Sequence, residues 1–276
     1  MSSDLKTKLA IIGITGRMGR EILSAVQRRN AEGEEQISVV AGIVEPGNVF
    51  VGDQLAGVDF PITDDWSSEF TDVNAIVDFS SPEGARKAIS LSREQKIPAV
   101  ICSTGLSQEL EDEVRELSNE VLVLRATNTS VAVNVMFDLV RNAASMLGKD
   151  YDVEIVEVHH RGKRDAPSGT ALTLAQEVAE VRNLSLEDDL VTGRFGMTGA
   201  RKDNEIAVLA LRGGDVAGEH TVYFFGAGER LEITQRSSNR GIFAEGAIRA
   251  AQWLVNKKAS GVRSGLFSMR DVLASK

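Results

Sequence analysis

The alternation of short apolar runs with helical patterns in the first half of the chain constrains the fold most. The runs are nearly continuous in Val, Ile, Leu and Ala, and they lie at 8–14, 37–45, 75–80, 98–104 and 121–127. Strands of this composition are typical of a parallel sheet covered on both faces. The helical patterns between them predict right-handed crossovers. We therefore expect an α/β domain built on a Rossmann-type, doubly wound parallel sheet.

The regular alternation of strands and helices ends at Ser130, and a second domain with a mixed sheet of the α+β kind is predicted after it. Its expected elements are a helix at 130–147, a strand at 152–160, a helix at 170–181 and strands at 205–214, 218–228 and 229–238. The longest expected loop is 182–205. A last amphipathic helix at 243–255 is expected to pack back on the first domain. The predicted domains are thus 1–130 completed by 241–276, for dinucleotide binding, and 131–240, for substrate binding and tetramerisation.

Composition excludes several classes of protein. The 276 residues include 31 basic and 40 acidic side chains, a formal net charge of −9, which argues against general affinity for nucleic acid or anionic membrane. The single cysteine, Cys102, cannot form an internal disulfide and suggests no zinc or redox framework. No stretch approaches the ~18 apolar residues that a membrane span needs, and the N-terminus does not resemble a secretion signal. We expect a cytosolic protein without a metal.

A glycine-rich loop follows the first predicted strand. Gly13, Gly16 and Gly19 in "GITGRMG" have the spacing GxxGxxG, a variant of the dinucleotide fingerprint. Glycine permits the tight turn and the close approach of a pyrophosphate, to which the following helix N-terminus presents N–H groups. A plain strand-to-helix turn is the alternative. The position between strand and helix favours cofactor binding.

The ends of three other strands carry candidate cofactor contacts. Glu45 ends the second strand, where a carboxylate accepts hydrogen bonds from a ribose 2′-OH and repels a 2′-phosphate, which favours NAD over NADP. Arg17 instead favours NADP, because its positive charge is able to neutralise the 2′-phosphate. "CSTG" at 102–105 and "ATNTS" at 126–130 have side chains that suit a nicotinamide ribose, although they are also ordinary helix caps.

The stretch "EVHHRGKRDAPSGTA" concentrates titratable nitrogen in one loop. His159 and His160 are two of only three histidines in the chain, and Lys163 follows between two arginines. Imidazole suits proton transfer near neutral pH, and the basic side chains suit a carboxylate. Gly169 and Thr170 begin a helix whose N–H groups face the same anion. Residue types alone predict a pocket for a small carboxylate with a proton donor beside it.

The same stretch closely resembles the signature E-x-H-H-x-x-K-x-D-A-P-S-G-T-A of the 4-hydroxy-tetrahydrodipicolinate reductase (dihydrodipicolinate reductase) family. The likeness extends over nearly the whole chain through "GITGRMGR", "VDFSSPEG", "SVAVNVM", "GEHTVYFFGAGERLEITQRSSNR" and "SGLFSMRDVL". It implies a homotetrameric enzyme of lysine and diaminopimelate biosynthesis. The implied reaction reduces 4-hydroxy-tetrahydrodipicolinate, through dihydrodipicolinate, to tetrahydrodipicolinate: water is lost, NAD(P)H supplies a hydride to C4, and the ring takes up a proton.

The resemblance also assigns residues. His159 matches the catalytic acid/base and Lys163 the second proton donor. Positions that match substrate contacts are His160, Gly169, Thr170 and Arg240. Positions that match cofactor contacts are Gly13, Ile14, Thr15, Gly16, Arg17, Met18, Glu45, Cys102, Ser103, Thr104, Ala126, Thr127, Asn128 and Thr129.

Four sites depart from the family's usual pattern. Gly162 stands where a further histidine is common, Cys102-Ser103 replaces Gly-Thr, and Thr129 replaces a frequent phenylalanine. Pro46 follows Glu45 where many members have an arginine able to meet a 2′-phosphate. We therefore expect NADH to be preferred, with NADPH also possible.

The sequence leaves three alternatives open. The first is another two-domain NAD(P)-dependent dehydrogenase of an amino or imino acid, which would not need "HHRGKRDAPSGT". The second is a non-catalytic nucleotide-sensing protein, which would be expected to lose the proton donors. The third is a structural role for the loop at a subunit interface.

Overall fold

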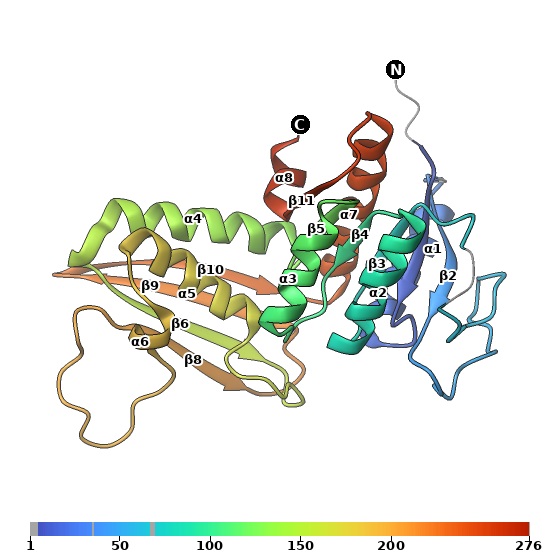
Figure 1. Ribbon diagram of the computed structural model, residues 1–276. Helices are drawn as coiled ribbons and strands as arrows, with labels where there is room; N and C mark the ends of the chain where they lie inside the picture. The colour runs from blue at the N-terminus through green and yellow to red at the C-terminus, as the bar shows by residue number, and fades with distance from the viewer. Residues whose placement is uncertain (1–4, 35, 67–69, 276) are drawn as a thin grey trace. The chain divides into compact units, whose positions relative to one another are not determined.

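A six-stranded parallel sheet organises the first unit of the chain, Met1–Ser130 with Gly241–Lys276. The computed structural model describes residues 5–34, 36–66 and 70–275, and Figure 1 shows its elements. The strand order is β11-β5-β4-β3-β1-β2. The strands are β1 (Thr7–Ile12), β2 (Ile37–Ile43), β3 (Ala75–Asp78), β4 (Ala99–Ile101), β5 (Leu122–Arg125) and β11 (Gly265–Phe267).

Helices cover both faces of this sheet because alternate strand residues are apolar on each side. The helices are α1 (Arg17–Ala31), α2 (Pro82–Gln95), α3 (Gln108–Leu117), α7 (Gly241–Ala259) and α8 (Met269–Ala274). The core on one face includes side chains of α1 and α7, and the core on the other includes α2 and α3. Ser81 accepts a hydrogen bond from the Gly84 N–H at the start of α2, just before Pro82 at the first helical position.

A five-stranded mixed sheet forms the second unit, Val131–Arg240, in the order β10-β9-β6-β8-β7. Its elements are α4 (Val131–Leu147), η1 (Gly148–Asp150), β6 (Asp152–His159), α5 (Gly169–Arg182), α6 (Leu186–Asp189), β7 (Leu190–Val191), β8 (Ile206–Arg212), β9 (Gly218–Gly226) and β10 (Glu229–Ser237). Strand β6 is parallel to β8 and antiparallel to β9. Side chains of α4 and α5 pack on one face, around Ile155, Val222 and Phe224.

The opposite face of this mixed sheet carries no helix among the described residues (Figure 1). Tyr223 and Phe225 stack on it with ring centroids 5.5 Å apart. Leu211 is 48% exposed there, and its register beside Val158 places both side chains on this same face. The second unit thus presents a sheet face on which exposed apolar side chains lie beside charged ones such as Glu219 and Arg236.

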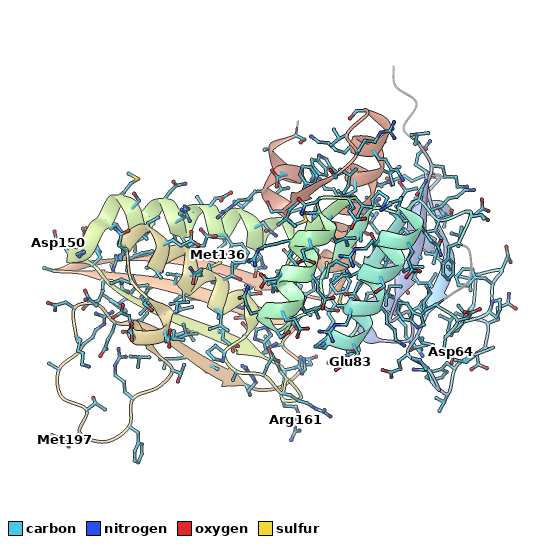
Figure 2. The ribbon with its side chains drawn as sticks, viewed as in Figure 1. Asp64, Glu83, Met136, Asp150, Arg161 and Met197 are labelled. Atoms are coloured by element: carbon cyan, nitrogen blue, oxygen red, sulfur yellow. The ribbon has the colours of Figure 1, made fainter. Side chains whose placement is uncertain are left out.

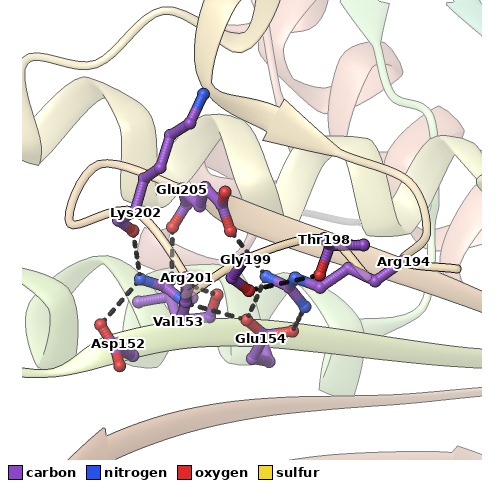
Figure 3. A network of polar contacts seen from close by, with 9 residues as sticks. All are labelled: Asp152, Val153, Glu154, Arg194, Thr198, Gly199, Arg201, Lys202 and Glu205. Atoms are coloured by element: carbon purple, nitrogen blue, oxygen red, sulfur yellow. Dashed lines mark hydrogen bonds and ion pairs between the residues drawn. The ribbon is translucent and has the colours of Figure 1, made fainter. Parts of the chain in front are cut away.

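The segment after β7 is an extended loop held to β6 by ion pairs. Met197, labelled in Figure 2, lies in this loop and is fully exposed. Arg194 donates to both carboxylate oxygens of Glu154 at 2.9 and 3.0 Å, and Arg201 donates to the same carboxylate at 3.0 Å (Figure 3). These contacts anchor the base of the loop to the start of the sheet.

The fold class agrees with the prediction from the sequence, with several differences in detail, among them η1 and α8, which were not predicted. The segment 182–205 was expected to be a loop, but it contains α6 and β7. The edge strand β11 was not predicted. Both β7 and β11 are only two or three residues long, and so they are too short to show a period of two. In the part of the chain that the structure describes, no helix combines the length and apolar character of a bilayer span.

The small side chains of α7 allow it to lie close to the end of the β5 segment. A Cβ atom placed on Gly246 would lie 1.8 Å from the carbonyl oxygen of Thr129. The Thr129 hydroxyl in turn donates a hydrogen bond of 2.6 Å to the Phe243 carbonyl. Two independent contacts therefore fix the separation of α7 from Thr129.

We predict that Gly246→Ala lowers the free energy of unfolding by about 3 kcal/mol or more, because a backbone clash cannot be relieved by rotating a side chain. Urea denaturation measures the change. Gly193→Ala is the matched control, since a Cβ there meets no atom within 4 Å. Equal stabilities of the two variants would contradict this account of the packing.

Candidate functional site

The C-terminal end of β6 carries two polar side chains on one face. Glu157 and His159 are two residues apart on a strand, so both point toward the face that α4 and α5 cover. Glu157 is fully buried and His159 is 9% exposed. His159 Nδ1 lies 2.5 Å from Glu157 Oε2. A titratable ring is therefore held by a carboxylate at the end of the sheet.

The negative charge of Glu157 is compensated by an arginine of the neighbouring strand β8. Arg212, at the end of β8, makes two hydrogen bonds to it, from Nη1 at 2.7 Å and from Nη2 at 2.8 Å. Burial opposes ionisation of Glu157, but the hydrogen bonds from His159 and Arg212 outweigh it and lower its pKa to about 2. The carboxylate is therefore ionised throughout the neutral range.

His220 of β9 packs beside this pair. Its ring meets the His159 ring edge to face, with centroids 5.3 Å apart, and its Nε2 lies 3.1 Å from the Ser168 hydroxyl. Burial, followed by repulsion from His159, lowers the pKa of His220 to about 3. His220 is consequently neutral throughout the neutral pH range.

The loop after β6 brings basic side chains to the same end of the sheet. Lys163 is 20% exposed in its side chain, and its Nζ pairs with Asp165 at 2.9 Å. His160 Nδ1 accepts a hydrogen bond from the Gly162 N–H at 3.1 Å, which orients the ring back over its own loop. Arg161 is exposed and projects from this loop (Figure 2). The loop is thus cationic and open to solvent on one side.

The first turn of α5 completes the polar site. The Ser168 hydroxyl caps the helix by accepting the Ala171 N–H at 3.2 Å, and the Ser168 N–H donates to Glu157 at 3.0 Å. Gly169 and Thr170 are the first two helical residues. Arg240 follows β10, whose last residue pairs with Gly218 at the same end of the sheet as His159. A helix N-terminus and a guanidinium thus stand at the end that holds the histidines.

A second polar site lies in the first unit, at the glycine-rich loop. A pocket of about 220 Å³ is lined there by residues of β1, the loop, the end of β2 and the start of α2: Ile12, Gly13, Thr15, Gly16, Val44, Glu45, Asn48, Trp66, Phe79, Ser80, Ser81 and Gly84. Gly13 has φ +76°, and a Cβ on Gly19 would lie 2.3 Å from the Gly13 carbonyl oxygen. Only glycine permits this turn and this close approach of helix to strand.

The loop fits the phosphates of a dinucleotide. Within the described residues, no side chain caps α1 at Gly16, and its first turn holds no acidic residue. The helix N-terminus therefore offers N–H groups and positive potential to an anion. Arg17 and Gly16 are exposed, whereas the Ile14 side chain is fully buried and Met18 packs against the core. Any contact of Ile14 with a ligand is thus made by its backbone.

The ends of β4 and β5 hold the remaining predicted cofactor residues. Cys102 and Ser103 are buried, and the Ser103 hydroxyl accepts the Ser80 N–H at 3.0 Å. Thr104 and Thr127 are exposed, Ala126 is buried, and the Asn128 side chain accepts the Ser130 N–H ahead of α4. In these segments the side chains of Thr104 and Thr127 are exposed, whereas those of Cys102, Ser103 and Thr129 are buried.

Asp78 shares this region and was not predicted from the sequence. It is fully buried at the end of β3 and is hydrogen-bonded by the Ser80 hydroxyl. Burial raises the pKa of the Asp78 carboxyl, although hydrogen bonds from Ser80 and Ser103 oppose the shift. Its role is to tie the ends of β3 and β4 together beneath the pocket.

Three residues of the histidine site were also missed by sequence reasoning. Glu157 stands two residues before His159, a spacing that puts both on one face of a strand and would have revealed the pair. Arg212 and His220 arrive from β8 and β9 through strand pairing, and no local pattern marks them. Among the described residues, no group of three His, Cys, Asp or Glu side chains is arranged to hold a metal ion.

A glycine-loop pocket on a Rossmann-type sheet, joined in one chain to a mixed-sheet unit with a buried histidine and a cationic loop, defines the class of two-unit dinucleotide-dependent oxidoreductases. Family models described as "Dihydrodipicolinate reductase, N-terminus" and "Dihydrodipicolinate reductase, C-terminus" match residues 7–129 and 132–273. The chain belongs to the dihydrodipicolinate reductase family.

Relatives of nearly equal length agree with this assignment. A 4-hydroxy-tetrahydrodipicolinate reductase of Pelobacter propionicus is 40% identical over 276 residues, covering 98% of this chain and 99% of that protein. One of Beijerinckia indica is 39% identical over 272 residues, covering 96% and 97%. Among solved structures, dipicolinate-bound dihydrodipicolinate reductase from Paenisporosarcina sp. TG-14 has a TM-score of 0.70 at 24% identity, covering 96% and 98% of the two chains. This last likeness supports the fold.

We predict that His220 makes folding sensitive to mild acid. The unfolded chain protonates this histidine below pH 6.5, but the folded protein does not until about pH 3. Stability therefore falls as the pH drops through 6.5, by roughly 1–2 kcal/mol between pH 6.5 and 5. Urea unfolding of the wild type and His220→Gln at pH 8, 6.5 and 5 measures this. The difference in stability between the two proteins should change in favour of the variant as the pH falls. Parallel curves would show that His220 is not held neutral.

Proposed function

We propose that the chain reduces 4-hydroxy-tetrahydrodipicolinate, by way of dihydrodipicolinate, to tetrahydrodipicolinate, and that His159 and Lys163 are its proton donors. The observation that carries the assignment of donors is the site at the end of β6. A buried imidazole held by a carboxylate lies there beside a cationic loop and the N-terminus of α5. Such a site suits a small dianion that must be protonated while it is reduced.

In this proposal, different residues of the second unit bind the substrate and donate protons. The N-terminal N–H groups at Gly169 and Thr170, together with His160 and Arg240, would bind the two carboxylates of the substrate. Lys163 is held by Asp165 at 2.9 Å and needs only to exchange this partner for the substrate. His159 would give a proton to the ring. When bound, the reduced nicotinamide supplies the hydride to C4.

The first unit would hold the cofactor. Gly13, Thr15 and Gly16 line the pocket with Glu45, so the phosphates would lie over the start of α1 and the adenosine ribose beside Glu45. The exposed Thr104 and Thr127 would face the nicotinamide ribose. Family membership gives NAD(P)H as the reductant. We propose that NADH is preferred, because Glu45 repels a 2′-phosphate and Pro46 supplies no compensating cation.

We further propose that the protein is a homotetramer assembled through the second unit. The bare sheet face presents Leu211 at 48% and Phe225 at 38% exposure, and the loop after β7 presents fully exposed Phe195 and Met197. Apolar patches of this kind mark association surfaces. We further propose that the enzyme acts in the cytosol, since its single cysteine fits a reducing compartment.

The first experiment follows NADH absorbance while the preceding synthase makes the substrate in situ from pyruvate and aspartate semialdehyde. Oxidation that requires the synthase supports the proposed reaction. A folded protein that binds NADH but oxidises none, with either cofactor, would instead favour another amino or imino acid dehydrogenase or a nucleotide sensor. Direct assays with amino acids and NAD would separate these two.

We predict that His159→Gln and Lys163→Ala each lower kcat by roughly 10²–10⁴-fold, the usual contribution of a general acid. Steady-state kinetics measures the loss, and circular dichroism and sedimentation check folding and assembly. Lys149→Ala, at an exposed lysine before β6, is the matched control and should keep full activity. Dissociation of the oligomer with little kinetic change would assign the loop to a subunit interface.

We predict that Glu45→Ala raises the KM for NADH more than the KM for NADPH, because it removes a ribose acceptor needed by the first and a repulsion felt by the second. Initial rates with each cofactor give the two ratios. Glu32→Ala, at an exposed glutamate just after α1, should change neither. Equal effects of Glu45→Ala on both cofactors would remove Glu45 from cofactor selection.

A further inference from the structure

We propose that Glu157, fixed by Arg212, is the positioning residue that holds His159 with Nε2 toward the substrate and sets its distance from the N-terminus of α5. This inference deepens the proposed function and rests on His159 being a proton donor. It concerns a residue that touches neither substrate nor cofactor and acts through the histidine.

The first observation is that one side of the His159 ring is already occupied. Nδ1 lies 2.5 Å from Glu157 Oε2, so the other ring nitrogen, Nε2, is the atom left for a ligand. A Cβ on Gly218 would lie 3.1 Å from Nε2. The absence of a side chain at Gly218 therefore keeps open the space directly at this nitrogen. Together the two residues give the ring one accessible nitrogen.

The second observation is that Glu157 itself cannot turn. Its Oε1 accepts from Arg212 Nη2 at 2.8 Å and from the Ser168 N–H at 3.0 Å. Its Oε2 accepts from Arg212 Nη1 at 2.7 Å and faces His159. A carboxylate held by a bidentate guanidinium has a fixed plane, and a histidine bonded to such a carboxylate has a fixed tautomer and orientation.

The third observation is the link from this carboxylate to the expected anion site. Ser168 donates its N–H to Glu157 and caps α5, whose first residues are Gly169 and Thr170. One carboxylate therefore ties the proton donor to the helix that is proposed to bind the substrate carboxylate. Arg212 also donates to the Asp165 carbonyl at 2.7 Å, which extends the same framework to the loop of Lys163.

The titratable and charged groups near His159 come from several elements. Glu157 lies on its own strand, Arg212 on β8 and neutral His220 on β9, while Lys163 and Asp165 come from the loop. A carboxylate at Nδ1 interacts favourably with an imidazolium, and an amide at the same place does so less. Exchanging the carboxylate of Glu157 for an amide therefore weakens the interaction that favours protonated His159, while the His159 ring stays in place.

The experiment compares Glu157→Gln with His159→Gln in the intact enzyme. We expect Glu157→Gln to lower kcat by roughly 10- to 100-fold, a part of what a general acid contributes, and to change the substrate KM by less than about threefold. The descending, high-pH limb of the kcat profile should move to lower pH, because the amide stabilises the imidazolium less than the carboxylate. A residue needed for stability alone would leave this limb in place.

Glu154→Gln is the matched control. Glu154 lies on the same strand and is bound by Arg194 and Arg201 (Figure 3), but it is three residues from Glu157 and faces the other side of the sheet. It should lose stability without a shift of the pH profile. A similar kinetic change in Glu154→Gln and Glu157→Gln would overturn the proposal.

A measurement on the wild type keeps the proposal testable if Glu157→Gln fails to fold. In nitrogen-15 NMR of labelled histidine, the neutral His159 ring should carry its proton on Nδ1, donated to Glu157. A proton on Nε2 would overturn the proposal. If His159→Gln keeps full activity, the proposed function of His159 fails; if it loses activity and Glu157→Gln does not, only this inference fails.

Discussion

The second unit depends on the burial of one ionised carboxylate at the end of its sheet. A fully buried carboxylate is unfavourable unless it is paired and hydrogen-bonded. Glu157 meets this requirement through Arg212, the Ser168 N–H and His159. Because each partner comes from a different element, Glu157 is buried in its ionised form with all its hydrogen bonds only when β6, β8 and the start of α5 are correctly assembled. The geometry of the histidine site and the integrity of the fold are thus coupled.

The mixed topology of this sheet creates the coupling. Strand β6 pairs in parallel with β8 and antiparallel with β9, so the ends of β6 and β8 meet the start of β9. His159, Arg212 and Gly218 are brought together in this way. Gly218 of β9 and Arg212 of β8 therefore lie on opposite sides of the β6 strand that carries His159.

In the first unit, glycines bring backbone segments close together at the proposed phosphate-binding loop. Gly13 takes a positive φ, and Gly19 lets α1 approach the turn more closely than any side chain would allow. The uncapped start of α1 then retains its positive potential. Asp78 and Ser103 link the neighbouring strand ends below this surface, since both side chains are buried and bonded to Ser80. These contacts stabilise the pocket from beneath.

Local sequence determined the strand–helix order, the glycine loop and the cluster of His159, His160 and Lys163. Each of these features consists of neighbouring residues that show a recognisable periodicity or motif. It also supported the family assignment. Tertiary structure decided what surrounds those residues. Arg212 and His220 lie more than fifty residues from His159 and reach it only by strand pairing, and short edges such as β7 and β11 exist because a neighbour supplies their hydrogen bonds. The periodicity of a sequence indicates which face of a single helix or strand is buried. The histidine site forms where the ends of several elements meet, and this depends on how the strands pair.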